Sequence, residues 1–235
     1  MSMTSTKLSG LPLFPLQTVL FPDGSLALRI FEVRYLDMIG SRHKAGQPFG
    51  VVCLSEGSET RRRASGTADG LPSADGLPSG DGFAHEAFFP VGTLACITKF
   101  ERPQPGLMRI DCVGMQRFRV ERSEQLKHGL WIADVELLAD DAEVPVPEDL
   151  AFTRAGLQGV VRNIEASIEQ GGEAAIELPL LEPYRWDDCG WLANRWCELL
   201  PLGPDVKHRF MALDSPLLRL ELVADALDQM GFELP

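Results

Sequence analysis

The stretch FPDGSLALRIFEVRY, residues Phe21–Tyr35, decides how the first part of the chain folds. Its first four residues predict a turn, because Pro22 presets one φ angle and Gly24 tolerates a left-handed backbone. Ser25–Ile30 alternates between apolar and other residues, which is typical of a strand. Over Phe31–His43 the apolar residues recur at helical spacing instead. The stretch therefore predicts a turn, a strand and a helix in immediate succession.

The segments around this stretch read mainly as short strands. Prolines interrupt the apolar run Leu11–Leu16, which favours an edge strand or an extended arm. The runs Gly92–Phe100 and Leu107–Val113 are joined by a proline-glycine loop, and together they predict a β-hairpin. A turn at Gly114–Gln116 is predicted to lead from it into a separate strand. Several short strands with one early helix indicate an α+β fold with a barrel or sandwich. The further predicted strands are Phe49–Leu54, Gly92–Phe100, Leu107–Val113, Arg117–Glu121 and Leu130–Leu138.

Residues 55–87 interrupt the strands with a segment rich in Gly, Ser, Asp and Pro. The hexapeptide ADGLPS occurs twice in tandem, at Ala68–Ser73 and Ala74–Ser79. Such a segment buries too little apolar area to offset the entropy lost on ordering. We interpret it as a tolerant, flexible loop, with Arg61–Arg63 as a solvated charge run.

After Val144–Pro147 the apolar period changes from two to about 3.6. A helix is predicted from about Pro147 to Gly171, and Asp187 and Asp188 can cap a second helix that ends before Pro201. A third follows Gly203-Pro204, and Ser215-Pro216 opens a fourth. We therefore predict a β-barrel subdomain over residues 1–143 and a C-terminal helical bundle over residues 144–235.

Charge is distributed unevenly along the 235 residues, whose formal net charge is −12. Residues 1–139 hold 15 acidic and 15 basic side chains, residues 140–188 hold 12 and 3, and residues 189–235 hold 7 and 4. The balances are therefore 0, −9 and −3. A neutral first part and an acidic remainder disfavour nucleic acid as a partner, because such binding depends on basic side chains that meet phosphates.

The ends and the cysteines of the chain predict its compartment. The first residues contain no apolar signal segment, and no run approaches the roughly 18 consecutive apolar residues of a membrane helix. The five cysteines are odd in number and form no CxxC pair. We expect reduced, buried thiols and a cytoplasmic protein without membrane attachment.

No motif for catalysis or for a cofactor is present. The sequence contains no Gly-Lys pair and hence no GxxxxGK[ST] phosphate loop, and it contains no GxSxG or HExxH motif. Four histidines, His43, His85, His128 and His208, are scattered at no ligand-like spacing, so we interpret them as surface or capping residues. We therefore predict a protein that is not an enzyme and that has no cofactor and no metal. A stand-alone hydrolase ranks last among the functions that we weigh.

Several segments together resemble the N-terminal, substrate-binding domain of Lon proteases, and they do so in the family's order. The resemblance covers nearly the whole chain except the loop at residues 55–87. The segments that carry it are Leu11–Leu16, Val19–Gly24, Leu26–Tyr35, Val91–Ile97, Gly114–Val120 and Asp205–Asp214.

The resemblance implies a PUA-like pseudo β-barrel (the pseudouridine-synthase-and-archaeosine-transglycosylase type) followed by a helical bundle. It also implies recognition of unfolded or specific polypeptides. Neither the ATPase module nor the protease module of full Lon proteases is found in this sequence, so ATP-dependent proteolysis is not carried over. We expect an ATP-independent adaptor or quality-control factor, with a protease among its candidate partners.

The residues at the strand-to-helix junction have a mainly architectural interpretation. Phe31 and Tyr35 lie four apart and can pack on one helix face. Glu32 occupies the first turn, where the helix dipole favours an acid, and Arg34 can pair with an acid or a carbonyl across the barrel.

Two ways of binding a polypeptide follow from this fold: an apolar groove between barrel and bundle, or a barrel edge that pairs with an extended peptide. The candidate contact residues are Tyr35, Phe100, Arg117 and Trp191. Trp186, Trp191 and Trp196 do not share one helical face, and we favour core packing for them. The alternative function is RNA binding, since PUA-like barrels often bind RNA. It would need a basic patch formed by Arg109, Arg117, Arg119 and Arg122.

Overall fold

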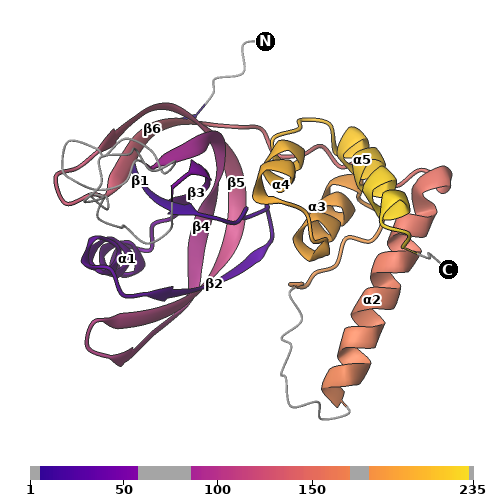
Figure 1. Ribbon diagram of the computed structural model, residues 1–235, viewed down its shortest axis with the longest axis horizontal. Helices are drawn as coiled ribbons and strands as arrows, with labels where there is room; N and C mark the ends of the chain where they lie inside the picture. The colour runs from indigo at the N-terminus through magenta and orange to yellow at the C-terminus, as the bar shows by residue number, and fades with distance from the viewer. Residues whose placement is uncertain (1–5, 58–85, 170–179, 233–235) are drawn as a thin grey trace, which may run out of the picture.

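The computed structural model describes residues 6–57, 86–169 and 180–232. A six-stranded sheet comes first, and helices follow it, which confirms the predicted α+β class (Figure 1). Most of the predicted loop, residues 58–85, lies outside the described residues. The strands are β1 (Lys7–Leu16), β2 (Ser25–Ile30), β3 (Phe49–Glu56), β4 (Ala87–Gln104), β5 (Leu107–Gln125) and β6 (Trp131–Leu137). The helices are α1 (Val33–Ala45), the 3₁₀ turn η1 (Glu148–Leu150), α2 (Ala151–Glu169), α3 (Cys189–Leu199), α4 (Pro204–Met211) and α5 (Pro216–Gln229).

The sheet closes on itself to form a barrel. Its strand order is β2-β5-β4-β3-β1-β6, and β6 also pairs with β5. Strands β1 and β3 run parallel, whereas the other pairs are antiparallel. The long strand β5 pairs with β2 through its first part and with β6 through its second part. As a result β2 stands apart from the closed ring.

Strand β1 differs from the sequence-based prediction of an edge strand or arm. It lies inside the sheet, where Pro15 is opposite Val52 on β3 and Pro12 is opposite Ile132 on β6. Each proline removes only its own N–H donor, so the remaining backbone groups still form both ladders. A bulge at Gly10, with a φ of 66°, interrupts the register with β6.

The turn predicted at Gly114 is also absent, and β5 runs through it without a break. Instead, Gly114 exchanges backbone hydrogen bonds with the Phe21–Gly24 turn: the Asp23 N–H donates to its oxygen and its own N–H donates to the Gly24 oxygen, both at 2.8 Å. A Cβ atom at Gly114 would lie only 2.0 Å from the Phe21 oxygen. Glycine is therefore required at position 114 because β5 and the Phe21–Gly24 turn approach each other closely there, and not because β5 turns.

Helix α1 packs against the barrel and ends at Gly46, whose φ of 61° gives a left-handed cap. Its buried face contributes Tyr35, Met38 and Ile39 to a core with residues from strands β1 to β5. The prediction of a strand followed directly by a helix is confirmed.

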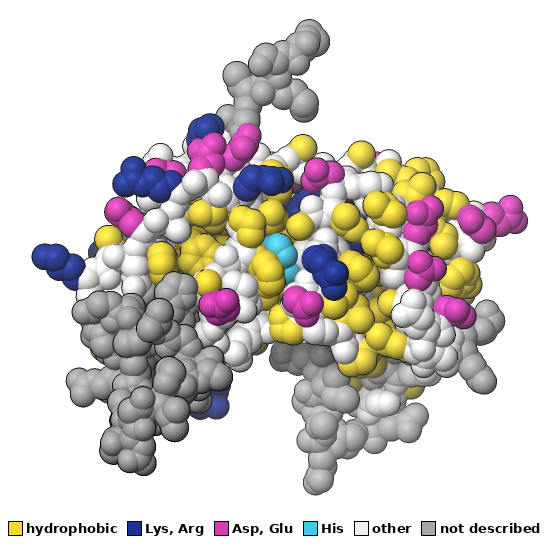
Figure 2. Space-filling model, turned by 45° about the horizontal axis from the view of Figure 1, so that its top comes forward, with side chains coloured by type: hydrophobic (Ala, Val, Ile, Leu, Met, Phe, Trp, Pro, Cys, Tyr) yellow, Lys and Arg dark blue, Asp and Glu magenta, His cyan; other side chains and the backbone are white. Residues whose placement is uncertain are grey.

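The C-terminal helices begin at the residues that the sequence predicts. Asp188 accepts a hydrogen bond from the Gly190 N–H at the start of α3, and Ser215 accepts one from the Leu218 N–H at the start of α5. Helix α3 packs against α5, while α2 extends away from the other helices in its second half (Figure 1). On the face drawn in Figure 2, the charged side chains over this helical part are mostly acidic.

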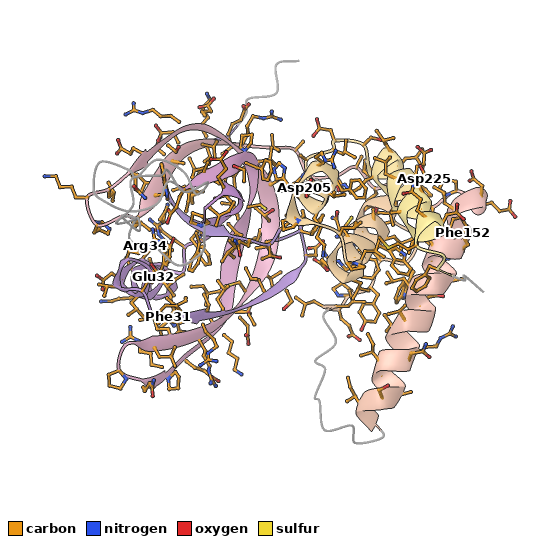
Figure 3. The ribbon with its side chains drawn as sticks, in the orientation of Figure 1. Phe31, Glu32, Arg34, Phe152, Asp205 and Asp225 are labelled. Atoms are coloured by element: carbon orange, nitrogen blue, oxygen red, sulfur yellow. The ribbon has the colours of Figure 1, made fainter. Side chains whose placement is uncertain are left out.

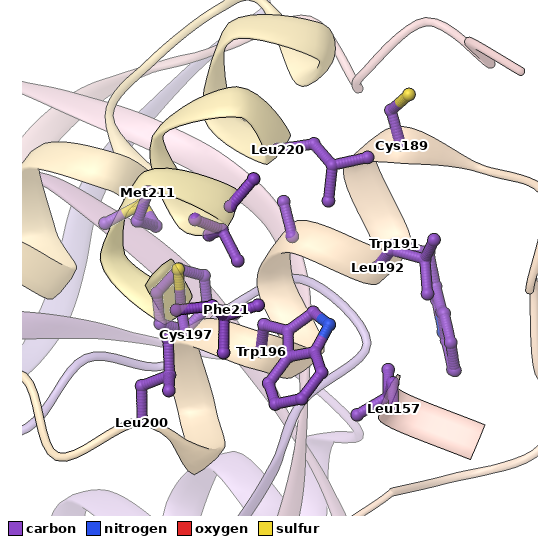
Figure 4. Packing of buried hydrophobic residues seen from close by; sticks show 14 of the residues in the cluster. Phe21, Leu157, Cys189, Trp191, Leu192, Trp196, Cys197, Leu200, Met211 and Leu220 are labelled. Atoms are coloured by element: carbon purple, nitrogen blue, oxygen red, sulfur yellow. The ribbon is translucent and has the colours of Figure 1, made fainter. Parts of the chain in front are cut away.

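Barrel and helices share one hydrophobic core (Figure 4). Trp196, Leu192 and Leu220 from the helices belong to the same buried cluster as Phe21 and Val91 from the barrel. No helix among the described residues is long and apolar enough to cross a membrane.

Candidate functional site

A groove of about 860 Å³ lies between α1 and the tip of the β4–β5 hairpin. We refer to it as the α1–hairpin groove. This volume is in the range of pockets that bind ligands. Residues that line it include Leu36, Gly40 and Ser41 from α1 and Arg102, Pro103 and Leu107 from the hairpin.

The wall of the groove on the hairpin side is held in place by stacked side chains. The Phe100 ring stacks on His43 with ring centroids 4.2 Å apart, and the Arg102 guanidinium lies 5.3 Å from the Phe100 centroid. Helix α1 comes close at Gly40, where a Cβ would be 3.4 Å from Arg102 Nη2. The groove has a mixed polar and apolar lining, in which Lys44 and Arg102 supply positive charge and Asp37 is the one carboxylate among the described lining residues.

Two exposed apolar side chains stand at the junction between β2 and α1. Phe31 is 57% exposed and Val33 is 72% exposed. The prediction that Phe31 packs on Tyr35 is wrong, since Tyr35 stacks on Phe14 with centroids 4.0 Å apart. Glu32 is the N-cap with an extended ψ of 132°, so Phe31 precedes the helix and does not share its face. We call Phe31 and Val33 the apolar rim.

Arg34 fixes this junction to the barrel (Figure 3). Its guanidinium donates to the Gly129 oxygen at 2.8 Å, to Glu86 at 3.3 Å and to Glu32 at 3.1 Å. Trp131 Nε1 donates to the same Glu86 carboxylate at 3.0 Å. The predicted pairing of Arg34 with an acid and a carbonyl is confirmed, and it holds the apolar rim outward.

The structure does not bring the four predicted contact residues together. Tyr35 and Trp191 are buried, the latter against Tyr184 and Trp186, and Arg117 is only 4% exposed. Only Phe100 is partly exposed, and it stacks on His43 beside the groove without being one of the residues that line it. Three of the four residues therefore stabilise the fold and present no surface to a partner.

Arg117 is buried because it connects the two halves of the chain. Its Nη1 donates to the Met211 and Leu213 oxygens at 2.8 and 2.9 Å, and its Nη2 donates to Asp141 at 2.9 Å. Arg219 donates to the same Asp141 and to Asn194. Sequence alone could not place these partners, because they lie far from Arg117 along the chain.

A second hollow, of about 410 Å³, lies between the end of β3, Phe89 and the start of α4. Glu56 and Asp205 give it an acidic lining. His208 lies nearby: its ring stacks on Phe89, and it is buried, which corrects its predicted surface position. Burial lowers the pKa of His208. Within the described ranges no group of three or more His, Cys, Asp or Glu side chains could hold a metal ion.

The α1–hairpin groove and its apolar rim were not predicted from the sequence. The one available signal was that Phe31 and Val33 fall just outside the buried stripe of the predicted helix. Apolar residues that leave the period of their element often mark a binding surface. The groove itself depends on how far the hairpin reaches over α1, which no local pattern reports.

The chain therefore has a barrel whose core is shared with the C-terminal helices and an open groove at one side. In a comparison with family models, the model for the ATP-dependent protease La (LON) substrate-binding domain matches residues 10–229. The chain belongs to this family.

Two solved structures of Lon N-terminal domains are also similar to this chain. The crystal structure of a Lon N-terminal domain protein from Xanthomonas campestris is 25% identical, with a TM-score of 0.61 over 97% of this chain and 100% of that one. The N-terminal domain of the Lon protease from Mycobacterium avium complex is 13% identical, with a TM-score of 0.53 and the same coverage, and it supports the fold alone. No curated protein sequence matches.

Proposed function

We propose that this protein is a non-catalytic module that binds polypeptides in the α1–hairpin groove and on its apolar rim. The observation that carries the proposal is the pair of exposed side chains Phe31 and Val33 beside an open groove, in a member of a substrate-binding family. Exposed apolar side chains next to a groove are a common feature of interaction sites.

The chemistry of the groove suits an unfolded segment. Leu36, Leu107 and Pro103 offer apolar contacts, while Lys44 and Arg102 offer donors for carbonyl or carboxylate oxygens. Apolar side chains are exposed in unfolded polypeptides and hidden in folded ones, so the site would discriminate between the two states. We further propose a cytoplasmic, ATP-independent role as an adaptor or quality-control factor, with a protease as a candidate partner.

RNA binding is not proposed. The basic patch that it would need included Arg117, which is buried and engaged by Asp141. The remaining three arginines, Arg109, Arg119 and Arg122, are distributed along the length of β5 and form no compact cluster. The net charge of −12 also opposes binding to phosphates.

The test is a titration of a fluorescently labelled, permanently unfolded polypeptide with the purified protein, followed by anisotropy. The same polypeptide in its folded form is the reference. Ser41→Trp places a large side chain in the groove, and Phe31→Ser combined with Val33→Ser removes the apolar rim. Both variants are expected to weaken binding about tenfold, which corresponds to roughly 1.4 kcal/mol.

Ser123→Trp is the matched control, because Ser123 is exposed on β5 away from the groove. It should bind as the wild type does. Absence of binding to the unfolded polypeptide by the wild type would overturn the proposed function. Equal binding by all variants would leave a binding module but would exclude this groove as its site.

A further inference from the structure

Strand β2 presents an open backbone edge. Among the described strands it pairs with β5 alone, from Ser25 opposite Val113 to Ile30 opposite Met108. It is the first strand in the order of the sheet, next to β5. In an antiparallel pair every second residue directs its N–H and C=O away from the partner strand. The free edge of β2 therefore carries a row of donors and acceptors that another strand could use.

The inner face of β2 is incompletely covered at this edge. Ile30 is buried, but Leu26 and Leu28 are only partly buried although they pack against the same core cluster. Apolar side chains of an adjacent strand would cover them, because residues opposite each other in a sheet pack side by side.

The outer face of β2 carries a positive charge next to its open edge. Arg29 is exposed and lies directly opposite Arg109 on β5, while Arg109 in turn lies opposite Glu101 on β4. Like charges opposite each other destabilise a sheet, and opposite charges stabilise it. Arg109 has Glu101 directly opposite it on its far side, whereas no described side chain lies directly opposite Arg29 on its open side. Asp111 is a diagonal neighbour of Arg29 on β5, but it lies directly opposite Lys99 on β4. A neighbour on that edge would be favoured if it placed an acidic side chain opposite Arg29.

We infer that an extended segment of another polypeptide adds to β2 as a further strand, with an acidic side chain opposite Arg29 and apolar side chains beside Leu26 and Leu28. The inference rests on the proposed function and specifies the substrate class: polypeptides in which apolar residues alternate with polar ones and include an acid. Main-chain hydrogen bonds would supply affinity for any extended chain, and the acid would supply selectivity.

The position of β2 connects this edge to the groove. Its six residues span about 20 Å and end directly before the apolar rim at Phe31. A bound segment longer than β2 would therefore reach the rim and then the α1–hairpin groove. The two surfaces form one continuous path for an unfolded chain.

The test uses labelled ten-residue peptides in which valine and threonine alternate and one central threonine is replaced by glutamate. Two further versions are N-methylated at every second backbone nitrogen, in one register or the other. Methylation in the register that faces β2 should abolish binding, while the other register should bind like the parent peptide. Side chains are identical in all three, so only strand pairing distinguishes them.

A charge reversal at Arg29 then tests whether β2 prefers a strand with an acidic side chain opposite this residue. Arg29→Glu should weaken the glutamate peptide about fivefold and strengthen a lysine version by a similar factor. Arg122→Glu reverses an exposed charge elsewhere on β5 and should change neither. Hydrogen exchange should show slower exchange of alternate β2 amides when the peptide is bound.

The outcomes separate this inference from the proposed function. Equal binding by the two methylated registers, or an unchanged preference in Arg29→Glu, would overturn strand addition. If the unfolded polypeptide still bound, the proposed function would stand. If neither probe bound, both would fall. Formation of a concentration-dependent dimer that blocks the peptide would assign the edge to a second copy of the chain and would also overturn the inference.

Discussion

Arg117 on β5 and Asp141 in the segment that leads to the helices form a largely buried ion pair, with Nη2 and Oδ1 2.9 Å apart. Asp141 also accepts hydrogen bonds from Arg219, so one carboxylate faces two guanidinium groups. Arg117 and Arg219 are 4% and 1% exposed. Asp214 also lies 3.9 Å from Arg117, but its side chain is 83% exposed. Because both cations are removed from water, the largely buried Asp141 carboxylate that they share is important for holding barrel and helices together.

Removal of this carboxylate should therefore be costly. Asp141→Ala is expected to lower the free energy of unfolding by about 3–5 kcal/mol, since it removes the largely buried carboxylate that two buried guanidinium groups share. Urea unfolding followed by circular dichroism measures the change. The neighbouring Asp140 is exposed, and Asp140→Ala should stay within about 0.5 kcal/mol of the wild type. A similar small effect for Asp141→Ala would show that the ion pair contributes little.

Gly114 gives a second prediction, with another glycine as its control. A Cβ at Gly114 would lie 2.0 Å from the Phe21 oxygen, so Gly114→Ala must displace either β5 or the Phe21–Gly24 turn. We expect a loss of about 3 kcal/mol or more in the free energy of unfolding. At Gly159 on α2 nothing lies within 4 Å of an added Cβ, and Gly159→Ala should stabilise the helix by about 0.5–1 kcal/mol. Thermal unfolding of the two variants should thus shift in opposite directions.

The helical half of the fold could be predicted from sequence because its signals are local. Asp188 and Ser215 cap the helices that they precede, and Pro204 begins α4. Each such residue interacts with backbone groups within one helical turn, so a few neighbouring residues are enough to predict where the helix begins.

The barrel was harder to predict because strand pairing is not local. Whether Gly114 forms a turn or passes through a continuous strand depends on Phe21, which approaches from a distant part of the chain. Likewise β1 contains prolines that are typical of edges, yet two neighbours pair with it. Local propensity cannot report which strands become neighbours.

At the candidate site, too, local features could be predicted from the sequence and contacts between distant segments could not. The partners of Arg34 were predictable in kind, because a charged side chain at a buried junction needs an acid or a carbonyl. The burial of Arg117 was not, since Met211 and Asp141 reach it only after the helices have folded against the barrel. Residues such as Arg117, which were predicted to contact a partner, therefore make their contacts inside the protein.

A further prediction concerns Glu198 on α3, which lies where α3 meets the Phe21–Gly24 turn. Its Oε1 accepts a hydrogen bond from Arg195 at 2.9 Å, while its Oε2 has no hydrogen-bond partner among the described residues. Burial raises the pKa of Glu198 from its ordinary value of 4.5 to about 8, although Arg195 and Lys207 lower it. Between these two values the folded protein binds more protons than the unfolded chain.

The free energy of unfolding should therefore fall as pH rises from about 4.5 to about 8, as Glu198 ionises in the folded state. The slope from this one group is at most about 1.4 kcal/mol per pH unit. It should be smaller in practice, because the side chain keeps 16% of its surface exposed. Buried His208 has the opposite effect, because its pKa is lowered. Through this residue the free energy of unfolding decreases as pH falls below 6.5, the ordinary pKa of histidine.

Glu198→Gln separates the two contributions, because it removes the ionisation of Glu198 and keeps His208. Urea unfolding of the variant and the wild type at a series of pH values from 5 to 8.5 gives two stability profiles. The wild type should lose stability relative to the variant as pH rises, so that the difference between the profiles is largest at the alkaline end. Profiles that run parallel would mean that the Glu198 carboxyl ionises with an ordinary pKa. The Arg195 guanidinium, which also donates to the Pro22 oxygen at 2.7 Å, would then be paired with a permanent anion where α3 meets the barrel.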